Sequence, residues 1–165
     1  MAFDFSGKRV VVAGGSRGIG RSIALGFAEA GADVSICARD PKALAATNEE
    51  IARFGHKAHS AQCDLGNEAQ VKRYVEEAAG ALGGIDILVN NASGFGSTDD
   101  EAGWAASLAV DVMATVRASH AAVPYIEKAG GGSIINISSI SGLQTSVRTP
   151  PYGAVKAAVI HYTRT

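Results

Sequence analysis

The chain alternates short runs of β-branched and apolar residues with longer helical patterns, and this alternation restricts the folds that it can adopt. Five such runs predict strands, and a helical pattern follows each of the first four. Parallel strands need a crossover between them, and right-handed crossovers leave helices on both faces of the sheet. We therefore expect a doubly wound α/β domain with strand order 3-2-1-4-5, whose ligands bind at the carboxyl ends of strands 1 and 4.

Turn and capping signals place the boundaries of these elements. Asp40 followed by Pro41 is typical of an N-cap and a first-turn proline, and Thr98 with Glu101 predicts a capping box for a long helix. The predicted strands are Lys8–Ala13, Asp33–Ala38, Lys57–Cys63, Ile85–Asn90 and Ser133–Ser138. The predicted helices are Arg21–Ala30, 41–54, Asn67–Leu82, 98–128 and a last one from near Tyr152. With no linker or repeat between them, residues 1–165 predict a single domain.

Composition narrows the function classes. The net charge of −1 and the charged fraction of 19% give no reason to expect a nucleic-acid partner or an anionic membrane surface. No apolar run reaches the length of a membrane span, and the N-terminus lacks the basic start of a signal peptide, so we expect a cytoplasmic protein. Cys37 and Cys63 have no metal-ligand spacing, which predicts buried inert thiols and no metal site.

A glycine-rich loop follows the first predicted strand. Gly14, Gly18 and Gly20 are spaced G-x-x-x-G-x-G, between a strand and a helix. A tight turn is the simpler interpretation of such a loop. The flanking elements favour dinucleotide binding, because glycine lets backbone amides approach a pyrophosphate at a helix N-terminus. The expected cofactor contacts are Gly14, Ser16, Arg17, Gly18, Ile19 and Gly20.

The end of the second predicted strand indicates which dinucleotide is preferred. An acidic residue there would bind the ribose 2′-hydroxyl of NAD, but the position falls on Ala38, with Arg39 next. Asp40 is the rival acidic candidate, although Pro41 marks it as a helix cap. Arg39 and Arg17 together suit a 2′-phosphate, so the sequence favours NADP(H) over NAD(H).

Tyr152 and Lys156 share one helix face because they are four residues apart. An ammonium close to a phenol favours the phenolate, which suits a general acid or base. Ser139 ends the fifth predicted strand, from which its hydroxyl can face the same cavity. Alone, the pair would be an ordinary surface pair and the serine a turn residue. Their occurrence downstream of the glycine loop favours a catalytic site.

These motifs in this order resemble the short-chain dehydrogenase/reductase family. The segments that carry the resemblance are AGGSRGIG (13–20), CDL (63–65), NNAS (90–93), ISSISG (137–142) and YGAVK (152–156). The resemblance covers nearly the whole chain and implies a Rossmann-type domain and the interconversion of a carbonyl and a secondary alcohol, as in a 3-oxoacyl reductase.

The resemblance also implies residue roles. Tyr152 would donate or accept the proton, Lys156 would favour its phenolate and hold the nicotinamide ribose, and Ser139 would bind the substrate oxygen. Asp64 would contact adenine and Asn90 would brace the strand end beside the cofactor. The motifs further place Leu65 and Ala92 among the cofactor contacts, together with Tyr152 and Lys156.

The chain departs from the family at three places. Ala13 stands where the glycine loop usually has threonine, and Ser93 where the NNAG motif has glycine. Asp111 stands where the family has a helix asparagine that supports a proton relay through water. A carboxylate can accept bonds from that water and from Lys156 but cannot donate them. Asp111 therefore either keeps a modified relay or is simply a polar helix residue, and we favour the relay.

Family members are longer, with two further strands and a substrate lid, so we expect this chain to be the N-terminal part of a reductase. The resemblance also implies a homo-oligomer, a dimer or a tetramer, and a small-molecule substrate. Two alternatives are a dinucleotide-binding regulator without turnover and an inactive fragment.

Overall fold

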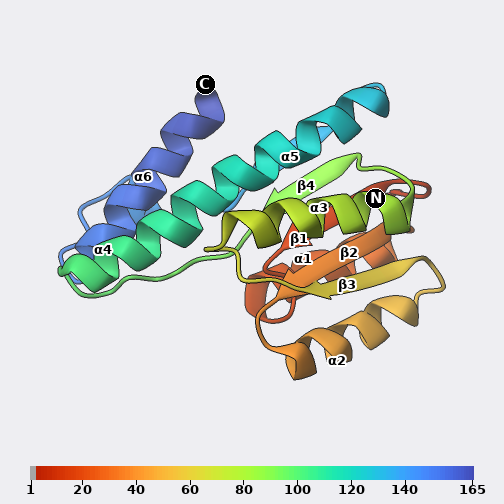
Figure 1. The fold of residues 1–165 in the computed structure, drawn as a ribbon, viewed down its shortest axis with the longest axis horizontal. Coiled ribbons are helices and arrows are strands. Elements are labelled where there is room, and N and C mark those ends of the chain that lie inside the picture. Colours follow the sequence, from red (N-terminus) through yellow and green to blue (C-terminus); the bar gives the residue numbers. More distant parts are fainter. Residues whose placement is uncertain (1–2) are drawn as a thin grey trace.

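The computed structural model describes residues 3–165, in which a five-stranded parallel sheet forms the centre of the domain (Figure 1). The strand order is β3-β2-β1-β4-β5, which confirms the predicted doubly wound topology. The strands are β1 (Arg9–Ala13), β2 (Asp33–Ala38), β3 (Ala58–Gln62), β4 (Ile87–Asn90) and β5 (Ser133–Asn136).

The register of the sheet brings the carboxyl ends of its central strands level. Ala13 of β1 is paired with Cys37 of β2 on one side and with Asn90 of β4 on the other, and Asn90 is paired with Asn136 of β5. The loops that leave β1, β4 and β5 therefore start from one edge of the sheet. This edge is where a doubly wound fold binds its ligands.

Helices cover both faces of the sheet. The helices are α1 (Gly18–Glu29), α2 (Pro41–Ala52), α3 (Glu68–Leu82), α4 (Glu101–Ser107), α5 (Ala114–Lys128) and α6 (Pro150–Arg164). A π-helical segment, Leu108–Met113, joins α4 to α5, and a 3₁₀ turn, Ile140–Gly142, precedes α6. In Figure 1, α4 and α6 lie together at one end of the molecule, and α5 runs from that end along the sheet. Helix α6 contacts both the π-helical segment and the 3₁₀ turn.

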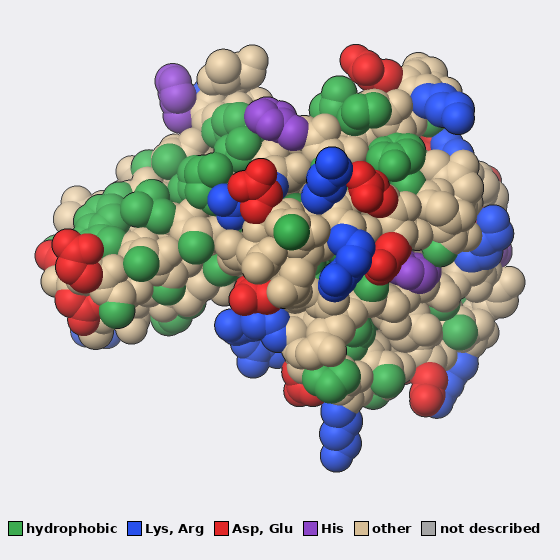
Figure 2. Space-filling view, in the orientation of Figure 1, with side chains coloured by type: hydrophobic (Ala, Val, Ile, Leu, Met, Phe, Trp, Pro, Cys, Tyr) green, Lys and Arg blue, Asp and Glu red, His purple; other side chains and the backbone are tan. Residues whose placement is uncertain are grey.

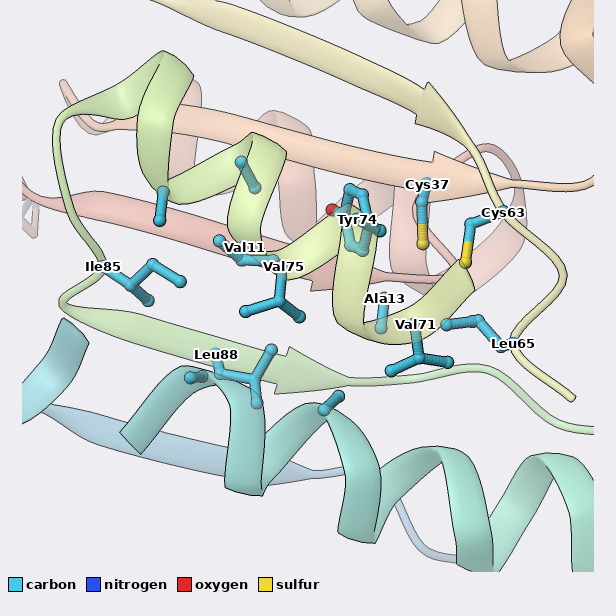
Figure 3. Close-up of a cluster of buried hydrophobic side chains, with 14 of the residues drawn as sticks. Val11, Ala13, Cys37, Cys63, Leu65, Val71, Tyr74, Val75, Ile85 and Leu88 are labelled. Atoms are coloured by element: carbon cyan, nitrogen blue, oxygen red, sulfur yellow. The ribbon is translucent and has the colours of Figure 1, made fainter. Parts of the chain in front are cut away.

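Side-chain alternation along the strands produces two cores. Val10 and Val12 pack with the small residues Ala24 and Ala28 of α1 on one face, whereas Val11 points to the α3 and α5 face. Figure 3 shows this second core, in which side chains of α3 meet Val11 and strand β4. Each valine that is fully removed from water contributes roughly 1.5–3 kcal/mol, so the central strands hold the carboxyl edge in place.

The two edge strands, β3 and β5, are less buried than we expect for strands predicted from apolar runs. Ile135 of β5 is 40% exposed, and β3 is only half-buried along most of its length. Each has a single neighbour among the described strands.

Figure 2 shows basic and acidic side chains interspersed on the face that it draws. Within residues 3–165, no helix combines the length and apolarity needed to span a bilayer.

Several predicted boundaries were wrong. The helix after the glycine loop begins at Gly18 rather than at Arg21, and the last helix begins at Pro150, where proline suits the first turn. The capping box of Thr98 and Glu101 does not start α4. Asp100 is the N-cap, because its carboxylate accepts the N–H of Gly103 at 2.8 Å, and this bond holds the pKa of Asp100 below its usual value.

Candidate active site at the carboxyl edge of the sheet

The glycine loop is held against the second strand by its backbone. The amides of Gly14 and Gly15 both donate to the carbonyl oxygen of Cys37, at 3.2 and 3.1 Å. Gly14 has φ of +87°, and a Cβ there would lie 2.9 Å from that of Ala92. A Cβ on Gly20 would collide with the carbonyl oxygen of Gly14. Glycine is therefore required at Gly14, which packs against the loop after β4, and at Gly20, where the first turn of α1 packs against Gly14.

The start of α1 fits an anionic ligand. Arg17 is the N-cap of α1, and no side chain of the described residues caps this end of the helix. Gly18 has φ of +54° and faces open space, and the side chains of Arg17 and Ile19 are exposed. Uncapped amides, an exposed guanidinium and the positive end of the helix dipole suit a pyrophosphate, so these residues would hold a nicotinamide dinucleotide.

Ser16 anchors the loop from below. Its carbonyl oxygen accepts the buried hydroxyl of Thr47 on α2 at 3.0 Å, and Ser16 itself is 9% exposed. The predicted contact residue thus has its carbonyl directed into the protein. This bond joins the loop to a second helix, which limits how far the loop can move when a ligand binds.

The carboxylate that follows β2, that of Asp40, is engaged as a helix cap through its Oδ1 oxygen. Asp40 accepts the amides of Lys42, at 2.9 Å, and Ala43, at 3.4 Å, which confirms that it is the N-cap of α2. Arg39 has an exposed side chain, and its carbonyl oxygen accepts the amide of Gln62 at 2.9 Å. The guanidinium of Arg39 thus lies near the strand end and forms no ion pair with any of the described residues.

The turn after β3 presents Asp64 and buries Leu65. The Asp64 carboxylate accepts the amide of Gly66 at 3.0 Å, which leaves its second oxygen available on the exposed side chain. Leu65 is 6% exposed and packs in the core beneath the turn. Leu65 therefore supports the loop from inside, whereas Asp64 offers a polar group at the surface.

The end of β4 is braced by two asparagines. The amide of Asn90 donates to Asn136 at 2.9 Å and to Ser119 at 3.2 Å, so this buried side chain ties β4 to β5 and α5. Asn91 donates to the carbonyl oxygen of Gly14 at 2.8 Å. The predictions did not include Asn91, although a polar residue at the end of a buried strand was an available signal.

A buried ion pair joins the catalytic candidates of two segments. The ammonium of Lys156 lies 3.0 Å from the carboxylate of Asp111, and their side chains are 4% and 0% exposed. Lys156 also donates to the carbonyl oxygen of Ile137 at 2.8 Å, and Asp111 accepts the amide of Gly94 at 2.9 Å. Asp111 therefore links the π-helical segment to α6 through an ion pair and to the loop after β4 through a hydrogen bond.

Tyr152 stands beside this pair. The Lys156 nitrogen is 5.6 Å from the centre of the Tyr152 ring, and Tyr152 is half-buried. The ring of Phe95 meets it edge-to-face, with 5.0 Å between ring centres. Tyr152 thus has a cation on one side, an aromatic ring on another, and a partly open surface.

Ser139 caps the turn that leads to α6. Its hydroxyl oxygen accepts the amide of Ser141 at 3.2 Å, while the Ser138 hydroxyl donates to the carbonyl oxygen of Lys156 at 2.8 Å. Gly142 packs so closely on α6 that a Cβ there would lie 2.6 Å from the backbone carbon of Lys156. The serine loop is therefore fixed against the helix that carries Tyr152 and Lys156.

The two thiols lie in the core, away from this edge chemistry. Figure 3 shows the sulfur atoms of Cys37 and Cys63 close together near Tyr74. Burial raises the pKa of the Cys37 thiol and of the Tyr74 phenol well above their usual ranges. Neither thiol is disulfide-bonded, and the described residues contain no cluster of three metal-ligating side chains. The predicted burial of both cysteines is confirmed.

Two hollows of the described surface lie away from the candidate site. One, of about 690 Å³, is apolar and lies beside Phe3, Phe5 and Phe27. The other, of about 430 Å³, lies between α3 and α5 and is lined by Lys72, Arg117 and other residues. Neither includes the glycine loop, Tyr152 or Lys156. The site is therefore identified by its chemistry and its place in the topology rather than by cavity volume.

Comparison with known proteins points to one family. The family model of the short chain dehydrogenases matches residues 8–165. An uncharacterized oxidoreductase of Mycobacterium tuberculosis (strain CDC 1551 / Oshkosh) is 41% identical over 98% of this chain. L-sorbose reductase from Gluconobacter frateurii, solved with NADPH and L-sorbose, is 33% identical over 99% of this chain, with a TM-score of 0.94.

A third similar protein is a 7α-hydroxysteroid dehydrogenase, solved with NADH and 7-oxo glycochenodeoxycholic acid. It is 31% identical over 98% of this chain, with a TM-score of 0.92. This chain spans 64% of the length of each of the three proteins. These two solved relatives were complexed with different nicotinamide dinucleotides, one with NADH and one with NADPH.

Proposed function

Because the chain belongs to the short-chain dehydrogenase family, we propose that it binds a nicotinamide dinucleotide and interconverts a carbonyl compound and a secondary alcohol. The observation that carries this proposal is the buried pair of Lys156 and Asp111 beside Tyr152, at the same sheet edge as the glycine loop. A 3-oxoacyl compound is the substrate that the sequence resemblance favours. The bound dinucleotide would supply or accept the hydride.

Tyr152 is the proposed proton donor in reduction and acceptor in oxidation. Its phenol is half-buried, so its hydroxyl can meet a substrate oxygen while most of its ring stays packed. The ammonium of Lys156 stabilises the phenolate that remains after the proton has left. Ser139 binds the same substrate oxygen and orients the carbonyl toward Tyr152.

Asp111 is proposed to hold the ammonium of Lys156 in position. Burial of an unpaired charge is costly, because the charge loses its contact with water. The carboxylate at 3.0 Å and the carbonyl oxygen of Ile137 offset that cost. In a modified relay, Asp111 would accept a hydrogen bond from a water that carries protons toward Lys156.

We propose that the cofactor contacts follow the loops of the sheet edge. Gly14, Gly18 and Gly20 shape the pyrophosphate loop, the amides near Ser16 and Ile19 face the ligand, and Asp64 contacts adenine, with Leu65 beneath it. Asn90 and Ala92 lie beside the nicotinamide half, near Tyr152 and Lys156. The close packing of Gly14 on Ala92 and the open space at Gly18 support this arrangement.

The proposed preference is for NADP(H) over NAD(H). Exposed Arg17 and Arg39 flank the place where a 2′-phosphate would lie, and Asp40 is engaged as a helix cap. Titration with NADPH and NADH, followed by cofactor fluorescence, tests this. Arg39→Asp should lower the NADPH-to-NADH affinity ratio by about tenfold or more, since it removes an arginine–phosphate contact and adds repulsion. An unchanged ratio contradicts the assignment.

We also propose a cytoplasmic homo-oligomer. Two free, buried thiols suit a reducing compartment. Leu108, Met113 and Val123 are exposed apolar residues on the π-helical segment and α5, which is a surface that association would cover. Sedimentation of the protein, with and without Met113→Glu, tests the oligomer. A monomer in both samples contradicts it.

Transfer of deuterium separates an enzyme from a dinucleotide-binding regulator. Incubation with NADPH deuterated at the transferable position and a panel of ketones should give an alcohol that carries deuterium at its carbinol carbon. Mass spectrometry measures the label. Dinucleotide binding without label transfer to any ketone supports the regulator instead, and the absence of both contradicts the cofactor site.

A further inference from the structure

We propose that Phe95 is a specificity-determining residue that selects substrates with a flat ring beside the carbonyl group. This inference rests on the proposed function and specifies its substrate class: aryl ketones in place of the linear 3-oxoacyl compounds that the sequence resemblance favours. Three features of the loop after β4 carry it: the backbone conformation of Phe95, the way its neighbours are anchored, and the position of its ring.

Phe95 occupies a backbone conformation that a bulky residue rarely adopts. Its φ is +45°, and it is the one non-glycine residue of the described chain with a positive φ. Such strain costs of the order of 1–3 kcal/mol and persists where the surroundings enforce it, often at ligand sites. Glycine or asparagine would adopt this positive φ with less backbone strain than phenylalanine. A phenylalanine here needs a reason other than stability.

The neighbours of Phe95 fix the turn in place. A Cβ on Gly94 would collide with the carbonyl oxygen of Ala106, and one on Gly96 with that of Gly103, so both glycines lie directly against α4. The amide of Gly94 donates to Asp111 at 2.9 Å.

Two further hydrogen bonds complete this anchoring. The amide of Gly96 donates to the buried hydroxyl of Ser107 at 3.0 Å, and the amide of Phe95 donates to Ser93 at 3.0 Å. The three successive amides of the turn are therefore all engaged. The turn cannot relax around Phe95 without breaking one of them.

The anchored turn directs the ring of Phe95 at the proposed catalytic tyrosine. The two rings meet edge-to-face at 5.0 Å, with an interplanar angle of 62°. Phe95 is nevertheless 58% exposed, so much of its ring remains free for a ligand. Tyr152 carries the proton, so a substrate whose carbonyl oxygen reaches that phenol has its substituent near the Phe95 ring.

The segment between β5 and α6 carries exposed apolar side chains near the start of the helix that bears Tyr152. Ile140, Leu143 and Val147 are 67%, 72% and 81% exposed, and the 3₁₀ turn of this loop packs on α6. An aromatic ring stacks on or against another ring with a preference that a flexible alkyl chain lacks. Phe95 would therefore favour a planar aromatic substituent over a linear one.

The test compares acetophenone with 2-octanone, two methyl ketones with the same number of carbons. Their dissociation constants are measured by ligand-observed NMR, for the chain alone and for the chain with NADPH. We expect acetophenone to bind about tenfold more tightly than 2-octanone. Phe95→Ala should reduce this ratio to about one or two, and Phe95→Tyr, which keeps the ring, should preserve it.

Phe95→Gly is the control for folding, because it removes the ring and also relieves the positive φ. We expect its melting temperature to equal or exceed that of the parent while its ring preference is lost. An unchanged acetophenone-to-octanone ratio in Phe95→Gly or Phe95→Ala overturns the proposal, as does a parent with no preference.

Fluorescence of NADPH in the same samples separates this failure from failure of the proposed function. Loss of the ring preference in both Phe95 variants, whether or not NADPH binds, supports the assignment of Phe95. Absence of NADPH binding overturns the cofactor proposal alone.

Discussion

Removal of the Asp111 carboxylate should destabilise the protein more than any single surface change. Asp111→Ala leaves the ammonium of Lys156 buried, with the carbonyl oxygen of Ile137 as its remaining partner, and deprives the amide of Gly94 of its acceptor. Breaking a buried ion pair by deleting one partner costs about 3–5 kcal/mol, because the other charge stays uncompensated. We expect the free energy of unfolding to fall by that amount.

Two matched variants separate the charge from the hydrogen bond. Asp111→Asn keeps an acceptor for the amide of Gly94 and should cost less than Asp111→Ala by about 1–3 kcal/mol, which is the penalty for leaving a buried donor unsatisfied. Asp111→Leu combined with Lys156→Met removes both charges and should cost less than the sum of the single changes. A cost for the double variant below that of Asp111→Leu alone would demonstrate the coupling most clearly.

Urea unfolding, followed through the fluorescence of Trp104, measures these free energies. Trp104 is the one tryptophan of the chain, and it lies on α4, next to the segment that carries Asp111. A loss below 1 kcal/mol for Asp111→Ala, or strictly additive costs in the double variant, would refute the reasoning. Either result would mean that the pair is not formed, or that solvent reaches it.

Other predictions concern the glycine loop and the opposite edge of the sheet. Gly20→Ala should cost about 3 kcal/mol and weaken NADPH binding, because its Cβ would strike backbone, whereas Gly26→Ala on the same helix meets nothing and should stabilise by about 0.5–1 kcal/mol; equal melting shifts for the two would be inconsistent with the packing. The Asp86 carboxylate accepts two hydrogen bonds from the guanidinium of Arg9 and one from the backbone amide of Arg9, and these bonds lower the pKa of Asp86. Because the folded-state pKa is depressed, its stabilisation is present above the unfolded value of about 3.9 and is lost as the pH falls through the folded value. Asp86→Asn should therefore cost about 2 kcal/mol at pH 7 and progressively less in acid, and a cost that is the same at every pH would exclude this origin.

Much of the fold was predictable because the central strands are short and strongly apolar. The valine run before Ala13 and the Asp40–Pro41 cap carry their signals within a few residues, and both are where the sequence put them. The limits of the half-buried edge strands differ from the prediction by one or two residues, and the central strand β4 begins at Ile87, two residues later than predicted. The proline that begins α6 was a local signal that the prediction underused.

The remaining features depend on contacts between distant segments. A π-helical segment at Leu108–Met113 interrupts the predicted long helix, and no local pattern marks it, because Asp111 there pairs with Lys156, 45 positions later. Asp100 and not Thr98 caps α4, because the carboxylate of Asp100 accepts the amide of Gly103 in the first turn of the helix. The positive φ of Phe95 contradicts its own propensity and follows from the anchoring of Gly94 and Gly96 on α4.

The role of Tyr152 is the central claim, and one comparison tests it most directly. The rate of NADPH-dependent ketone reduction is measured for the parent and for Tyr152→Phe, both at saturating NADPH. Loss of the proton donor should lower the rate by roughly 10²–10⁴-fold, while the dissociation constant for NADPH changes by less than about threefold. A Tyr152→Phe variant that reduces the ketone as fast as the parent would contradict the account.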